Sequence, residues 1–126
     1  MNRLFASGAF LAGLAVALGA VGAHALKDTL LAAGRTETFE LAVRYMFYSA
    51  VGLIALGLFK RQMPGLRFSS FIAGLFLVGT FFFSGSLIAL CLTPWRWVVF
   101  VTPVGGFCMI AGWVVLGWGA WREESL

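Results

Sequence analysis

The chain has 126 residues, of which 61% are hydrophobic and only 11% are charged, and its mean hydropathy is +0.96. So few polar side chains cannot cover the apolar surface of this chain in water, which excludes a water-soluble domain and makes lipid its solvent. The net charge of +4 could suggest nucleic acid, but the basic residues stand where apolar stretches end, so membrane topology explains them better.

The first of four apolar stretches begins after Arg3 and ends at Lys27-Asp28, where two adjacent charges mark its arrival at water. A stretch of roughly 20 residues matches, as a helix, a hydrocarbon core about 30 Å thick. The string Ala23-His24-Ala25 imitates a signal-peptide cleavage site. The uncharged run before it is longer than the usual signal core of about 7–15 residues, so we expect a retained membrane span.

The second stretch follows a short polar connection in which Thr36 or Thr38 is the expected N-cap of the next helix. Its uncharged run, from Tyr45 to Phe59, would cover only about 22 Å as a helix. Arg44 is therefore expected within the outer third of the membrane, or with its guanidinium group reaching the membrane surface.

The third and fourth stretches are separated by Thr93-Pro94 and by the string Trp95-Arg96-Trp97, which is typical of an interfacial anchor. Thr102-Pro103 then either opens the main helix of the fourth span or kinks a longer helix that begins near Trp97. At the end of that span, Trp118 and Trp121 predict a second aromatic belt, followed by a solvated tail at 122–124.

The sequence thus predicts one all-α domain over residues 1–126, an antiparallel four-helix transmembrane bundle with short loops. Its spans are residues 4–26, 38–59, 68–92 and 97–121. One face carries Arg3, Lys60, Arg61, Arg67 and Arg122, and the other carries Lys27, Arg35, Arg96 and the partly buried Arg44. The basic cluster in the second connection and the free amino group at Met1 favour an orientation with both termini in the cytoplasm.

Small residues recur at helical spacing in the first and fourth spans. Helices in lipid associate through close van der Waals contact, which small residues permit. The faces that we expect to pack against other helices carry Ala15, Gly19 and Ala23 in the first span and Gly105, Gly112 and Gly119 in the fourth.

Polar residues gather near one end of the spans. Because the first and third spans end on the face from which the second and fourth begin, these residues share one half of the bilayer. The predicted ligand-binding cluster consists of His24, Glu40, Arg44, Tyr45, Tyr48, Ser84, Ser86 and Thr102. On the second helix, Glu40 precedes Arg44 by four residues, so the two can pair.

The predicted function is binding of a lipid or a partner membrane protein through this cluster. His24 could titrate near neutral pH and Arg44 could hold an anionic headgroup, while the simpler alternative is that Arg44 only reaches toward water and His24 lies at the interface. A small transporter or channel for a proton, an anion or a small metabolite is the other hypothesis, and it requires a continuous polar path. The glycine-lined faces are also compatible with a homo-oligomer.

Catalysis and metal binding have little support in the sequence. His24 is the single histidine, no serine or cysteine has a recognisable base partner, and Cys91 and Cys108 lie in apolar stretches without CxxC spacing. We therefore expect no enzyme, no cofactor and no metal. An enzyme acting on lipid would need His24, Arg44 and Ser84 together at hydrogen-bonding distance.

Several strings together resemble the transmembrane protein 256 family, also called domain of unknown function 423. They are residues 19–27 (GAVGAHALK), 38–45 (TFELAVRY), 83–87 (FSGSL) and 102–106 (TPVGG), the last followed by Gly112-Trp113. The resemblance covers essentially the whole chain in order. It implies a small multi-pass membrane protein, found in the bacterial inner membrane and in organelles of bacterial descent, with no established activity and no named substrate.

The chain departs from this family at two positions of the second span. Where the family often has Gln after the Arg-Tyr pair and His one helical turn later, this sequence has Met46 and Ser49. A second histidine is thus missing, which weakens any proposal of paired-histidine metal or proton chemistry. Arg44 is left as the favoured centre of the site.

Overall fold

The computed structural model describes residues 1–124, and the side chains of residues 1–122. The acidic part of the predicted solvated tail, Glu123-Glu124, lies outside the described side chains. The helices are α1 (Arg3–Ala23), α2 (Lys27–Ala33), α3 (Thr36–Gln62), α4 (Ser69–Leu92), the 3₁₀ helix η1 (Arg96–Phe100) and α5 (Thr102–Glu124). Four stretches are long and apolar enough to cross a membrane, namely α1, α3, α4 and the stretch from Arg96 to Arg122. The predicted all-α, four-span fold is confirmed.

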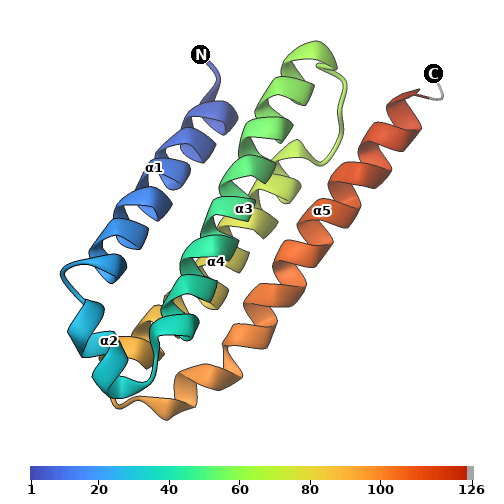
Figure 1. The fold of residues 1–126 in the computed structure, drawn as a ribbon. Coiled ribbons are helices and arrows are strands. Elements are labelled where there is room, and N and C mark those ends of the chain that lie inside the picture. Colours follow the sequence, from blue (N-terminus) through green and yellow to red (C-terminus); the bar gives the residue numbers. More distant parts are fainter. Residues whose placement is uncertain (125–126) are drawn as a thin grey trace.

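The four long helices run alternately up and down, and the start of α1 and the end of α5 lie at the same end of the bundle (Figure 1). The centre of the bundle is the pair α3 and α4. Helix α1 packs mainly on α3, and α5 packs mainly on α4. As a result, α1 is the least buried of the four spans, and grooves remain on both sides of α3.

The larger core cluster is purely apolar. It is formed by Leu53, Leu56, Leu66, Ile72, Ala73 and Phe76, against which side chains of α1 and α5 pack. A smaller cluster of Leu30, Phe39 and Cys91 joins α2, α3 and α4 at the opposite end. Because the buried side chains Ser84 and Ser86 lie in the second half of α4 and Thr80 lies at its middle, the two halves of the bundle differ in character, as the sequence indicates.

Glycines set the distance between α4 and α5. A Cβ atom added at Gly105 would lie 2.7 Å from the carbonyl oxygen of Gly79 and against the backbone of Phe83, so a side chain there would push the helices apart. Gly112 lies against the ring of Phe76, and Gly119 against Leu66. In α1, Ala15 is buried, a Cβ on Gly19 would meet Val43 at 3.5 Å, and Ala23 is exposed.

The connection after α1 is more structured than the sequence analysis expects. Helix α1 ends at Ala23, three residues before the predicted end, and the connection contains the short helix α2. Its string of Leu, Ala and Lys favours a helix, and Gly34 ends it in the left-handed conformation, with φ of 67°. Leu30 is buried there, which holds α2 against the bundle.

The structure corrects the predicted start of the second span and decides between the two alternatives for the fourth. The N-cap of α3 is Arg35, which makes no side-chain capping bond, so neither predicted threonine serves as the cap. In the fourth span, α5 begins at Thr102 with Pro103 in its first turn, after the separate 3₁₀ helix η1. Of the two alternatives for Pro103, the structure therefore shows the opening of a helix, because proline at the first turn sacrifices no intrahelical hydrogen bond.

Candidate functional site

The structure distributes the predicted polar cluster over several places instead of one pocket. His24 is the exposed C-cap of α1. Glu40 and Arg44 line a pocket with α1 and α2, whereas Tyr45 and Tyr48 line a groove with α5. The hydroxyl groups of the second half of α4 lie between helices.

The three hydroxyl residues of the predicted cluster make contacts between helices. The Oγ of Ser84 donates a hydrogen bond of 2.6 Å to the carbonyl oxygen of Ala42 on α3. The hydroxyls of Ser86 and Thr102 are 2.5 Å apart and join α4 to the start of α5. These residues belong to the packing of the bundle, and Ser84 does not line the pocket that holds Arg44.

The two tyrosines belong to an aromatic groove between α3 and α5. The Tyr45 ring lies 5.1 Å from the Tyr48 ring and 5.1 Å from the Phe83 ring of α4, measured between centroids. Together with Leu41, Gly106, Met109, Ile110 and Trp113, they line a cavity of about 400 Å³. No charged residue is among those that line this groove, so it offers apolar surface with phenol groups at one side.

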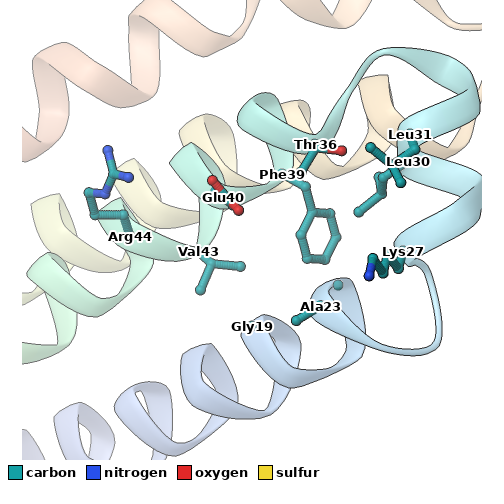
Figure 2. Close-up of a pocket in the computed structure, with 11 residues that line it drawn as sticks. Gly19, Ala23, Lys27, Leu30, Leu31, Thr36, Phe39, Glu40, Val43 and Arg44 are labelled. Carbon is teal, nitrogen blue, oxygen red and sulfur yellow. The ribbon is translucent and has the colours of Figure 1, made fainter.

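Glu40 and Arg44 lie in a second cavity, also of about 400 Å³, between α1, α2 and α3 (Figure 2). We call it the α1–α3 pocket. It is lined by Gly19, Gly22, Ala23, Lys27, Leu30, Leu31, Thr36, Phe39, Glu40, Val43 and Arg44. It thus combines a wall of small and apolar side chains with three charged ones.

The local sequence explains the shape of this pocket. Gly19 and Gly22 leave the surface of α1 without side chains, and a Cβ on Gly22 would lie 2.5 Å from the ring of Phe39. That ring is buried and forms the floor, while α2 closes one end with Leu30. The hollow therefore exists because glycines on α1 face an aromatic residue on α3.

The charges of the pocket are separated along its length. In Figure 2, Lys27 and Arg44 lie at opposite ends of the group of side chains and Glu40 lies between them. The spacing of Glu40 and Arg44 allows an ion pair. Among the residues with described side chains, these two form none. An exposed pair at this spacing is worth only about 0.3–0.5 kcal/mol, so solvation of both groups competes with it. All three charged groups are exposed.

Arg44 lies eight residues after the first residue of α3, which corresponds to about 12 Å along the helix axis. Because its side chain is exposed, the guanidinium group can extend toward the membrane surface, as the sequence predicts. Thr36 and Lys27 lie nearer to the end of the bundle, in the first turns of α3 and α2.

The sequence does not predict that Lys27 lines a pocket or that α2 forms its end wall. In the sequence, Lys27-Asp28 marks only the end of the first span, and the connection after it is predicted to be short and polar. The signal that could have revealed it is the string Lys27–Ala33, which is short, helix-favouring and followed by glycine. Among the residues with described side chains, no three His, Cys, Asp or Glu residues are grouped so that they could hold a metal ion.

These features define the class of the protein. Four apolar helices long enough to cross a bilayer, with charged residues gathered at their ends, make an α-helical multi-pass membrane protein.

The comparisons with known proteins give the family. Residues 18–106 match the model of the family described as "Protein of unknown function (DUF423)", and the chain belongs to this family. It is 36% identical to a UPF0382 membrane protein of Staphylococcus saprophyticus over 91% of this chain and 93% of that one. It is 37% identical to the UPF0382 inner membrane protein YgdD of Escherichia coli K12, over 85% and 80% of the two chains. No solved structure matches this chain.

The family agrees with the resemblance found in the sequence, since domain of unknown function 423 is the same family. The protein is therefore a multi-pass protein of the bacterial cell (inner) membrane. The relatives are named as membrane proteins without an activity.

Proposed function

We propose that this protein binds a membrane lipid with an anionic headgroup in the α1–α3 pocket. The observation that carries the proposal is the composition of the pocket, in which the cations of Lys27 and Arg44 flank an apolar wall. The lining has two basic residues and one acidic residue, so the pocket has a net positive charge. A lipid is the ligand class in which an anionic group and an apolar chain occur together.

The depth of the pocket suits such a ligand. Lys27 opens α2 and Arg44 lies in the third turn of α3, so the two cations occupy the zone where a membrane-spanning helix meets headgroups. An arginine can hold a phosphate by two parallel hydrogen bonds, and a lysine contributes a point charge. The glycine surface of α1 and the side chains of Phe39 and Val43 would contact the apolar part.

Transport has weaker support than binding. Within the described residues, the buried hydroxyls of Thr80, Ser84 and Ser86 already make hydrogen bonds to other protein groups, and only the buried hydroxyl of Ser49 has none. Beyond them the bundle is filled by the apolar cluster around Leu53 and Phe76. A continuous polar path through one copy of the chain would have to cross this cluster, which offers no polar side chain.

The test is native mass spectrometry of the protein released from bacterial membranes, with co-purified lipids identified. Arg44→Ala should lower the retained anionic lipid by about tenfold or more, since a charge-assisted hydrogen bond contributes about 1.5–3 kcal/mol. Ala23→Phe should have the same effect without changing charge, because Ala23 is exposed and lines the pocket. Agreement between the two variants would separate loss of the site from loss of a charge.

Two control variants lie near the same end of the bundle. Arg96→Ala removes a cation that does not line the α1–α3 pocket, and His24→Ala removes the titratable residue that lies outside it. Both should retain lipid as the wild type does. Equal retention by wild type, Arg44→Ala and Ala23→Phe would overturn the proposal. Recovery of a protein partner that is lost in these variants would instead favour the binding of a membrane protein.

A further inference from the structure

A second pocket lies at the opposite ends of α1 and α3, near the start of the chain. It has a volume of about 520 Å³ and is lined by Met1, Asn2, Arg3, Leu4, Gly57, Lys60 and Arg61. We call it the basic pocket. Three of its side chains are cationic and none is acidic, so its charge differs from that of the α1–α3 pocket, which includes Glu40.

The walls of the basic pocket are held in place by specific contacts. The side-chain amide of Asn2 donates a hydrogen bond of 3.0 Å to the carbonyl oxygen of Gly57, while its Oδ1 accepts one from the backbone N–H of Phe5. A Cβ on Gly57 would lie 2.5 Å from the backbone nitrogen of Phe5, so α1 approaches α3 closely here. These contacts fix the beginning of α1 against the last turns of α3.

Lys60 is also positioned by the protein. Its Nζ donates hydrogen bonds of 2.7 Å to the carbonyl oxygen of Pro64 and 3.0 Å to that of Leu66. An ammonium group has three donors, so one N–H and the full charge are left for a ligand. Arg3 and Arg61 are exposed, and both guanidinium groups are accessible.

Within the described part of the chain, the carboxylates that could neutralise these cations lie far from the basic pocket. The carboxylates with described side chains are Asp28, Glu37 and Glu40, all in α2 or the first turns of α3. Helix α3 has 27 residues, so its two ends are about 40 Å apart. Because the lining of the basic pocket brings cations together without a carboxylate, it favours the binding of an anion from outside the protein.

We propose that the basic pocket binds the phosphate of an anionic phospholipid headgroup. The pocket lies where spans begin and end, at the depth of headgroups, and its lining of two arginines and one lysine supplies the charge and the hydrogen-bond donors that a phosphate accepts. Topology alone accounts for basic residues on this face, such as Arg67, but it does not require three of them to surround one hollow. The site is separate from the α1–α3 pocket, so each can be tested without the other.

The test uses the full chain in nanodiscs of phosphatidylcholine with a minor fraction of phosphatidylglycerol, followed by native mass spectrometry. The background variant Arg44→Ala isolates the basic pocket from the other proposed site. In this background, removal of one lining arginine should lower phosphatidylglycerol retention at least about tenfold, the factor expected for loss of a charge-assisted hydrogen bond to the phosphate. Arg3→Gln and Arg61→Gln should each show this loss, and the double variant a larger one.

Arg67→Gln is the matched control, because it removes a cation from the same end of the bundle without touching the lining of the pocket. Both leaflets of a nanodisc can be given the same lipids, so a change of topology in the cell does not affect the result. An equal loss in Arg67→Gln would overturn the proposal, and so would unchanged retention in the double variant. Displacement of the lipid by millimolar inorganic phosphate would overturn the lipid assignment in favour of a soluble phosphate.

Discussion

Ser84 on α4 donates its hydroxyl proton to the carbonyl oxygen of Ala42 on α3, across 2.6 Å in the buried centre of the bundle. Ser49 on α3 is equally buried, but among the described residues its Oγ has no hydrogen-bond partner. The same type of side chain thus has opposite energetic roles in the two helices. The pair allows a matched test of buried hydroxyl groups in this protein.

Ser84→Ala should destabilise the protein. The substitution removes the bond between helices and leaves the second acceptor position of the Ala42 carbonyl group unused, at a cost of about 1 kcal/mol. The free energy of unfolding in mixed micelles, titrated with a denaturing detergent, measures this effect. Ser70→Ala, an exposed position of the same helix, should leave the transition unchanged, and an equal shift in both variants would contradict the role assigned to Ser84.

Ser49→Ala should be neutral or stabilising, by up to about 1 kcal/mol, because it removes a buried hydroxyl group that lacks a partner. The same unfolding titration measures it. Ser49→Val is a second variant, which adds volume and tests whether the site is filled. A clear loss of stability in Ser49→Ala would show that the hydroxyl has a partner, such as a bound water molecule.

Gly105→Ala should weaken the packing of α4 on α5, since the new methyl group would overlap the backbone of α4 at Gly79 and Phe83. Overpacking of this kind costs about 1–3 kcal/mol. Gly117→Ala is the control within the same helix, because a Cβ there meets no atom within 4 Å. This control should be neutral or slightly stabilising, as alanine favours a helix over glycine. Similar unfolding midpoints for the two variants would contradict the close contact at Gly105.

The orientation that the basic residues predict can be measured by cysteine labelling. In a background where Cys91 and Cys108 are replaced by alanine, Arg61→Cys should be protected from a membrane-impermeant maleimide in intact spheroplasts. Arg96→Cys, at the other end of the bundle, should react. Labelling of Arg61→Cys from outside would place both termini outside the cytoplasm and contradict the positive-inside interpretation.

The sequence allowed the spans to be predicted because each one is a long apolar run, and the short connections between successive runs require an antiparallel arrangement. It also indicated the family, since the strings at 19–27 and 38–45 resemble the family's motifs and follow one another in the same order. Local detail was less predictable. The helix α2 was missed because seven residues give a weak periodic signal, and the cap of α3 was wrong because Arg35 makes no capping bond that a sequence pattern could reveal.

The predicted polar cluster shows the same limit at the level of the site. Topology alone places its residues in one half of the bilayer, which follows from the direction of each helix. The sector of the helix surface on which each side chain lies depends on how α1, α3, α4 and α5 rotate and pack. The structure therefore separates Ser84, which lies between helices, from Arg44, which lies in the α1–α3 pocket.

By itself, the sequence determined that this is a four-span membrane protein with charged ends, because hydrophobic length and the cost of burying charge in lipid act on each segment independently of the others. Only the tertiary structure decided that Lys27 joins Arg44 at one pocket and that Arg3, Lys60 and Arg61 surround another. Such groupings depend on contacts between segments distant in the chain, set by glycines such as Gly22 and Gly57 that let the helices approach.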